Sequence, residues 1–223
     1  MKFIHSADPS HGISELSTRL VTLLKGHKKV LWLLAGGSNI PIAAEVMSQI
    51  RRKVSSDELS RLTLALTDER YGPVGHADSN WFQLTQTSVD LSGIKTYPIL
   101  RDLPLAETID AYGKDAEIFL NSADVIIAQF GMGADGHIAG LLPHCSALQS
   151  THLVDGYVGQ PFTRISLTIP VLRKINVAYA FIFGESKKVA LQKLRDETLS
   201  LAEQPAQILR EIPEVYVYED VLG

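Results

Sequence analysis

The sequence has very little cysteine and no long apolar segment. Cys145 is the only cysteine among 223 residues, so no internal disulfide can form, which favours a reducing compartment. No stretch approaches the roughly 18 apolar residues that a membrane span requires. Met1–Pro9 carries His5 and Asp8 where a secretory signal has an apolar core. We therefore expect a cytoplasmic protein with no membrane partner.

An excess of positive charge is also absent. The formal net charge is -4 and the pI is near 6.0, which gives no electrostatic reason to expect a nucleic-acid partner. The seven histidines show no paired spacing with acids or cysteine that makes a ligand set, so we expect no metal. The length fits one α/β domain over residues 1–223, as a monomer or a homodimer.

The stretch from Asp124 to His137 contains the most informative pattern. Asp124–Phe130 is rich in β-branched and apolar residues, which is typical of a strand buried on both faces of a parallel sheet. A loop follows with three glycines and two chemically capable side chains: Gly131, Gly133, Asp135, Gly136 and His137. Loops at the carboxyl ends of parallel strands are where α/β folds bind ligands. This loop is the candidate active site.

The same loop matches Gly-x-Gly-x-x-Gly, the pattern of dinucleotide-binding folds. That reading requires a helix of about three turns after the last glycine. Pro143 ends any such helix within a few residues, and Gly140 weakens it further. We therefore expect no nicotinamide or flavin cofactor.

Three other segments could take part in a site. Val30–Ala35 is a predicted strand, and Gly36-Gly37-Ser38-Asn39 then leads into a helix near Pro41, an arrangement that either binds an anion or makes a tight turn. The strand Leu62–Thr67 delivers Asp68-Glu69-Arg70 into a loop, where these charges are either solvated or functional. Leu141–Phe162 is expected to be irregular, as a lid or wall of a site.

Strands alternate with helices along the whole chain. This order predicts an α/β fold with a mainly parallel sheet and helices on both faces. Arg164–Ile169 alternates polar and apolar residues as a half-buried strand does. The other expected strands are 94–99, 176–183 and 215–218, and the expected helices are 14–25, 81–86 (capped by Asp78 or Ser79), 106–120, 188–195 and 206–211.

Four loops in order, each after a predicted strand, resemble those of the 6-phosphogluconolactonases, relatives of the glucosamine-6-phosphate deaminases. They are Ala35–Ser38, Thr67–Arg70 with the later Asp78-Ser79-Asn80, Gly131–His137, and Gly184–Lys187, joined by Arg164–Pro170. The resemblance covers nearly the whole chain. It implies a Rossmann-like doubly wound fold and a cofactor-independent hydrolase of a sugar-phosphate lactone.

Two positions separate the branches of this superfamily. Arg70 stands where deaminases usually have Tyr, and Leu142 where they have the Glu that assists ring opening. A leucine cannot transfer a proton, which favours the lactonase. Ala139–Pro143 fits the lactonase pattern, although Gly140 replaces a usual Ser and Ala134 a usual acidic residue or proline.

The resemblance also implies roles for individual residues. His137 would activate water, with Asp135 and Asp68 as the catalytic carboxylates, and backbone N–H groups of the glycine loop would stabilise an oxyanion. Two alternatives stay open: a deaminase or isomerase that uses Asp68 as its base, and a non-catalytic sugar-phosphate sensor. The phosphate group would be bound by Gly36, Gly37, Ser38, Arg70, Arg164 and Lys187.

Overall fold

A seven-stranded parallel sheet forms the centre of the computed structural model, which describes residues 1–223. The predicted α/β fold is therefore confirmed, and β6, the strand before the glycine loop, is its middle strand. In spatial order the strands are β1 (Lys2–His5), β10 (Glu214–Glu219), β9 (Val177–Ile182), β6 (Val125–Phe130), β2 (Val30–Leu34), β3 (Leu62–Leu66) and β5 (Lys95–Tyr97).

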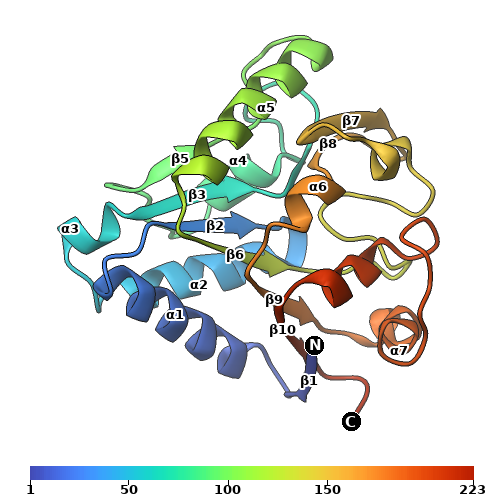
Figure 1. Ribbon diagram of the computed structural model, residues 1–223, viewed down its shortest axis with the longest axis horizontal. Helices are drawn as coiled ribbons and strands as arrows, with labels where there is room; N and C mark the ends of the chain where they lie inside the picture. The colour runs from blue at the N-terminus through green and yellow to red at the C-terminus, as the bar shows by residue number, and fades with distance from the viewer.

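Helices cover both faces of this sheet, as predicted. Figure 1 shows α1 and α2 on one side and α5 and α6 on the other. No helix combines the length and the apolar character needed to cross a membrane. The helices are α1 (Ser10–Lys25), α2 (Ile40–Arg51), α3 (Ser56–Leu59), α4 (Asn80–Thr85), α5 (Leu105–Ser122), α6 (Ile169–Leu172) and α7 (Lys188–Asp196), and 3-10 turns occur at Gly37–Asn39, Ser146–Gln149, Glu185–Lys187 and Pro205–Glu211.

A second, three-stranded antiparallel sheet was not predicted. It consists of β4 (Asp68–Arg70), β8 (Thr163–Leu167) and β7 (Val154–Val158), in that order. Two expectations are therefore wrong: Asp68–Arg70 is a strand, and the segment 141–162 contains one. Neither stretch has a continuous apolar run that would indicate a strand. Each is extended because it pairs with β8.

The half-buried pattern predicted for Arg164–Ile169 is also wrong. Every residue from Arg164 to Leu167 is buried, including the polar ones. Ser166 is accommodated because its hydroxyl donates to the carbonyl oxygens of Ala139 and Leu167. Ser166 thus meets another layer of protein in place of water.

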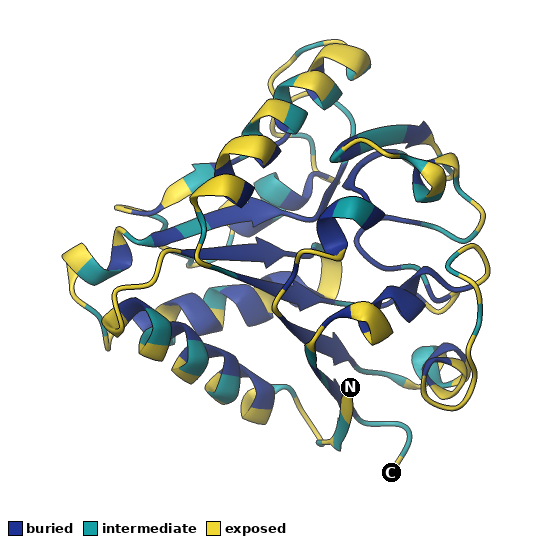
Figure 2. Cartoon of the chain, viewed as in Figure 1, coloured by how far each residue is buried: buried dark blue, intermediate teal, exposed yellow.

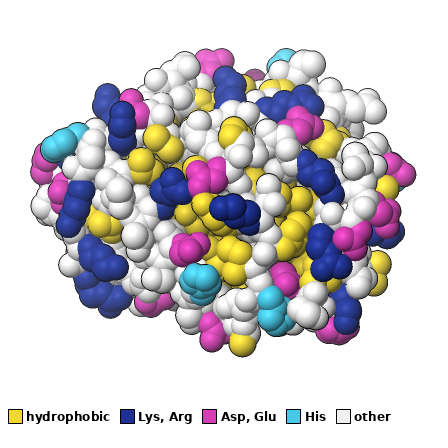
Figure 3. Space-filling view, turned by 60° about the horizontal axis from the view of Figure 1, so that its bottom comes forward, with side chains coloured by type: hydrophobic (Ala, Val, Ile, Leu, Met, Phe, Trp, Pro, Cys, Tyr) yellow, Lys and Arg dark blue, Asp and Glu magenta, His cyan; other side chains and the backbone are white.

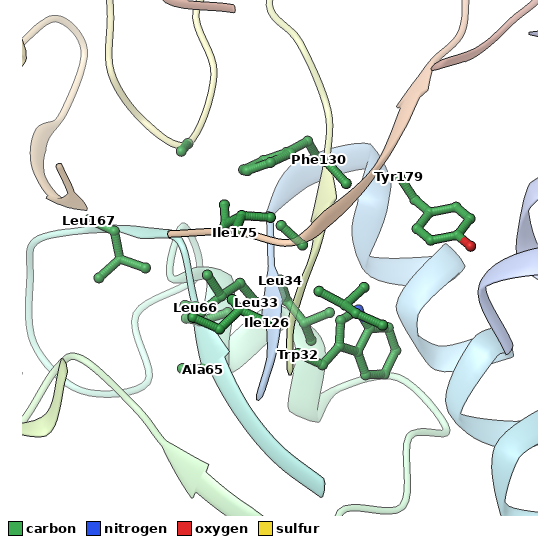
Figure 4. Packing of buried hydrophobic residues seen from close by; sticks show 14 of the residues in the cluster. Trp32, Leu33, Leu34, Ala65, Leu66, Ile126, Phe130, Leu167, Ile175 and Tyr179 are labelled. Atoms are coloured by element: carbon green, nitrogen blue, oxygen red, sulfur yellow. The ribbon is translucent and has the colours of Figure 1, made fainter. Parts of the chain in front are cut away.

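The hydrophobic core extends over both sheets as one cluster of 61 buried residues. All residues of β2 and β9 are buried, as expected for strands covered on both faces (Figure 2). Figure 4 shows Trp32, Leu34, Leu66 and Phe130 among the side chains that fill it. On the face in Figure 3, Lys and Arg side chains are interspersed with Asp and Glu.

The sheet order places the candidate site. From β2 the chain proceeds outward to β3 and β5, whereas from β6 it proceeds the opposite way to β9 and β10. The loops after β2 and β6 therefore diverge at their carboxyl ends, and the space between them is the usual ligand position in doubly wound folds. The loops 36–39 and 131–137 border this space.

Candidate active site

A cavity of about 180 Å³ lies between the loops that follow β2 and β6. Six segments of the chain line it: the turn after β2, the strand β4, the first residue of α4, the loop from Gly131 to Gly140, the strand β8 and the turn before α7. All predicted site residues border it except Asp135 and Gly136. The lining residues are Ala35, Gly36, Gly37, Ser38, Asn39, Asp68, Arg70, Asn80, Gly131, Met132, Gly133, His137, Ala139, Gly140, Arg164 and Lys187.

His137 is held from behind by Asp135. Nδ1 of His137 lies 2.7 Å from Oδ1 of Asp135, and the backbone N–H of His137 donates to the same oxygen at 3.2 Å. An ionised carboxylate only accepts hydrogen bonds, so Nδ1 carries the proton. The neutral ring then has a lone pair on Nε2, the nitrogen that a general base needs.

The Asp135 carboxylate is suited to this position. Its burial acts to raise the pKa, but hydrogen bonds and charge interaction with His137 outweigh burial and lower the pKa to about 2. Asp135 therefore stays ionised at neutral pH. It touches His137 and does not border the cavity, so it orients the imidazole from outside.

Two glycines of the loop have a different role from the predicted one. The N–H of Gly133 donates to the His137 carbonyl oxygen at 3.0 Å, and the N–H of Gly136 donates to the Gly133 carbonyl oxygen at 3.0 Å. Both groups are satisfied within the loop, which contradicts the prediction that they stabilise an oxyanion. A Cβ on Gly133 would lie 2.1 Å from Nδ1 of His137, so the glycine makes room for the imidazole.

The turn after β2 and the start of α7 form one end of the cavity. Gly37 has φ +62° and nothing within 4 Å of where a Cβ would stand, so its backbone is open to a ligand. Lys187 reaches the cavity from the turn before α7, and none of the ion pairs of the protein includes it, although neighbouring Lys188 pairs with Glu185. The Lys187 ammonium is thus available to a ligand.

The second sheet supplies the other charged groups. Asp68 and Arg164 are both buried and lie 3.8 Å apart, between Oδ2 and Nη1, while the Thr67 hydroxyl donates to the other oxygen of Asp68 at 2.9 Å. Arg70 donates from Nη1 to the Asp78 carbonyl oxygen at 2.9 Å. The Nε atoms of both arginines have no partner.

Six lining residues were missed as site residues: Ala35, Asn39, Asn80, Met132, Ala139 and Gly140. Asn39 is the N-cap residue of α2, but its side chain makes no capping bond there. Its side chain instead packs against Gly131, where a Cβ would lie 2.5 Å from the end of the Asn39 side chain. The backbone carbonyl oxygen of Asn39 accepts a hydrogen bond from the Gln129 Nε2 at 2.8 Å.

Asn80 had two usable signals, its place beside the predicted cap Ser79 and its place in the quoted motif Asp78-Ser79-Asn80. Ser79 does cap α4, because its Oγ accepts the N–H of Phe82 at 3.0 Å. Asn80 donates from Nδ2 to the Asp68 carbonyl oxygen at 2.9 Å and packs tightly against Gly36, where a Cβ would lie 1.9 Å from the Asn80 Oδ1.

The structure shows no group of three or more His, Cys, Asp or Glu side chains arranged to hold a metal ion. The chemistry available at the cavity is that of one imidazole, one carboxylate, three cationic side chains and backbone amides. Such a set fits acid–base chemistry on an anionic ligand.

Known proteins resemble this chain in sequence and in fold. The human 6-phosphogluconolactonase is 26% identical over 176 residues, 74% of this chain and 67% of that protein. The Nostoc 6-phosphogluconolactonase is 29% identical over 193 residues, 79% of this chain and 76% of that protein.

Solved structures resemble it over almost the entire length. The 6-phosphogluconolactonase from Thermotoga maritima has a TM-score of 0.79 at 21% identity, covering 97% of this chain and 98% of that one. The enzyme from Shewanella baltica has a TM-score of 0.80 at 19% identity, covering 97% and 96%. At these identities the likeness shows a shared fold.

A family profile matches most of the sequence, over residues 10–217. Its description is "Glucosamine-6-phosphate isomerases/6-phosphogluconolactonase". The chain therefore belongs to the family of glucosamine-6-phosphate isomerases and 6-phosphogluconolactonases.

Proposed function

We propose that this protein hydrolyses 6-phospho-D-glucono-1,5-lactone to 6-phospho-D-gluconate, a step of the oxidative branch of the pentose phosphate pathway. The observation that carries the proposal is the meeting of an Asp135-oriented imidazole and three cationic side chains, of which Lys187 has no ion-pair partner, in one cavity. The relatives with curated names support the same reaction, since they are called 6-phosphogluconolactonases.

The phosphate group of the substrate would bind at the end formed by Gly36, Gly37, Ser38 and Lys187. Backbone N–H groups near a helix N-terminus attract anions, and the ammonium of Lys187 adds a full charge. Arg164 and Arg70 would contribute further charge from β8 and β4, since both border the same cavity. A dianion and a planar guanidinium make strong, oriented hydrogen bonds.

His137 would perform both proton transfers. Its Nε2 takes a proton from water while the water oxygen attacks C1 of the lactone, which gives a tetrahedral intermediate. The bond from C1 to the ring oxygen then breaks, and the imidazolium returns the proton to that oxygen. The products are a carboxylic acid, which ionises, and a free hydroxyl group, so no cofactor is consumed.

Asp68 has a supporting place in this scheme. It is the only carboxylate that borders the cavity, and it already accepts from Thr67 and faces Arg164. We propose that Asp68 positions Arg164 and accepts a hydrogen bond from a substrate hydroxyl group.

The deaminase reaction of this family is the second candidate. It would use Asp68 as a base on a carbon acid and needs a further acid to open the sugar ring. Leu142 stands where a deaminase has that carboxylate, and its side chain does not border the cavity. The cavity thus lacks a second carboxylate, which favours the lactonase.

A direct comparison of substrates tests the proposal. Freshly prepared lactone and glucosamine 6-phosphate are offered separately, with acid release and ammonia release as readouts and spontaneous lactone hydrolysis subtracted. We expect acid release only. Ammonia release from glucosamine 6-phosphate would favour the deaminase, and binding of either compound without turnover would favour a sensor.

We further propose a cytoplasmic location, in keeping with the single cysteine.

A further inference from the structure

Glu69 is a fully buried acid that the proposed chemistry does not use. Its exposed fraction is 0%, and it does not border the cavity. Side chains alternate along a strand, so Asp68 and Arg70 of β4 face the cavity while Glu69 between them points the opposite way. Burial raises the pKa of the Glu69 carboxyl, and four hydrogen bonds act against that rise.

Three of those bonds join β4 to the start of α4, and the fourth lies within β4. Oε1 accepts the backbone N–H groups of Arg70 at 2.8 Å and Asn80 at 2.6 Å. Oε2 accepts the Ser79 hydroxyl at 2.9 Å and the Trp81 N–H at 3.0 Å. The first N–H groups of a helix have no acceptor within the helix. Here the buried Glu69 carboxylate accepts those of Asn80 and Trp81.

The residues joined in this way form one wall of the cavity. Asn80 donates to the Asp68 carbonyl oxygen, which closes a ring of contacts with Glu69, and packs against Gly36 at the proposed phosphate end. None of the four bonds involves the loop that carries His137 and Asp135. The Glu69 contacts can therefore be altered without removing the hydrogen bonds between Asp135 and His137.

We propose that Glu69 is a positioning residue for substrate binding: its carboxylate fixes Asp68, Arg70 and Asn80 as one rigid wall of the site. The proposal rests on the proposed lactonase function for the identity of the substrate. It separates two parts of the site, a wall set by Glu69 that determines binding and a His137–Asp135 pair that determines the rate of the chemical step.

The substitution Glu69→Gln tests this assignment. A carboxamide keeps the shape but replaces one acceptor oxygen by a donor, so at least one backbone N–H of the wall loses its partner. We expect KM to rise about tenfold, with kcat within about twofold of wild type, because weakened binding of this kind leaves the chemical step intact. Simple destabilisation would lower the amount of active enzyme, and hence the apparent kcat, without changing KM.

A matched control is Glu58→Gln. Glu58 also accepts a backbone N–H at the start of a short helix, from Ser55 at 2.7 Å, but it is only partly buried and does not line the cavity. We expect KM and kcat of this variant to equal those of wild type. An unchanged KM in Glu69→Gln, whatever its kcat, would overturn the positioning role.

A binding measurement separates this proposal from the proposed function. The dissociation constant of 6-phosphogluconate, measured by calorimetry, requires no turnover, and we expect Glu69→Gln to weaken it about tenfold in parallel with KM. If the wild-type protein binds this compound but does not hydrolyse the lactone, the proposed lactonase function is wrong. The effect of Glu69→Gln on the dissociation constant would still test the positioning role. Wild-type affinity in Glu69→Gln would contradict the positioning role alone.

A milder variant decides the question if Glu69→Gln does not fold. Ser79→Ala removes one of the four bonds to Glu69 together with the cap to Phe82. We expect its KM and dissociation constant to rise about twofold to fivefold, the size of one lost hydrogen bond. Wild-type values for both would overturn the proposal.

Discussion

Asp135 and His137 are joined by two hydrogen bonds to one oxygen: Oδ1 of Asp135 accepts both the ring Nδ1–H, at 2.7 Å, and the backbone N–H, at 3.2 Å. The two residues are separated by Gly136 alone, whose φ of +82° turns the chain back on itself. A side chain at that φ would be strained and would also strike Gln204. The sequence Asp-Gly-His thus encodes both the tautomer and the direction of the imidazole.

Replacing Asp135 by Asn should slow the chemical step. The carboxamide can no longer hold a protonated Nδ1 as an ionised acceptor does, so part of the population presents the wrong nitrogen to water. We expect kcat to fall about tenfold to a hundredfold, and His137→Ala to cost about 10²–10⁴-fold, the usual contribution of a general acid–base group. Binding of 6-phosphogluconate should change little in both variants.

Asp124→Asn is the control for Asp135→Asn. Asp124 also accepts a backbone N–H, from Lys29 at 2.8 Å, but it stands at the opposite end of β6 from the cavity. Its kcat should match wild type. A kcat in Asp135→Asn as high as in Asp124→Asn would mean that the imidazole needs no orienting carboxylate.

The lowered pKa of Asp135 predicts how stability depends on pH. The pKa is 3.8 in a free chain and about 2 in the folded protein, so the folded state favours the ionised form. This contribution is fully present above pH 3.8 and is lost as the pH falls from there towards about 2. Denaturant unfolding of wild type and Asp135→Asn should therefore differ more at about pH 5 than at about pH 2.5. An equal difference at both pH values would contradict the ion pair with His137.

Lys187 should contribute to binding and not to the chemical step. It borders the cavity and takes part in none of the ion pairs of the protein, so its charge is available to a phosphate. We expect Lys187→Met to raise KM about tenfold to a hundredfold, the loss of one charged hydrogen bond, with a smaller change in kcat. Lys188→Met is the matched control, since Lys188 pairs with Glu185 and lies outside the cavity lining. Equal KM values in the two variants would contradict phosphate binding at Lys187.

The parallel sheet could be predicted from sequence because its strands carry a local signal. Val30–Leu34 and Val177–Ile182 are continuous apolar runs between turn residues, and burial on both faces requires such runs. The loop after β6 was predicted to hold a site because the carboxyl ends of parallel strands are where α/β folds bind ligands. The other site residues, Arg164 and Lys187 among them, were chosen from the resemblance to the lactonase motifs, and ten of the twelve chosen residues border one cavity.

The second sheet could not be predicted, because its signal is not local. β4 is Asp68–Arg70, a charged triplet, and it is extended only because β8, about a hundred residues later, supplies its hydrogen bonds. The burial of Glu69 follows from the same pairing, since β4 turns Asp68 and Arg70 to the cavity and Glu69 to α4. From sequence alone, three consecutive charged residues are expected to be exposed to solvent, because nothing local shows the groups that pair with them.

Gly140 should be intolerant of substitution. Its φ is +70°, and a Cβ would lie 2.5 Å from Cβ of Asp68, so any side chain is both strained and in collision with the cavity wall. The turn cannot move away easily, because the Gly140 carbonyl oxygen accepts the Tyr157 hydroxyl at 2.5 Å and the Ala139 carbonyl oxygen accepts that of Ser166. We expect Gly140→Ala to lose about 1–3 kcal/mol of stability and to raise KM, because Asp68 must shift.

Gly113 supplies the opposite expectation. It lies within α5, and a Cβ at this position would have nothing within 4 Å, so Gly113→Ala should stabilise the protein by about 0.5–1 kcal/mol. Urea unfolding of both variants, with KM measured alongside, checks the pair. A Gly140→Ala variant as stable as wild type, with unchanged KM, would show that the turn can yield. The backbone around Gly140 and Asp68 would then adjust more easily than the hydrogen bonds from Tyr157 and Ser166 imply.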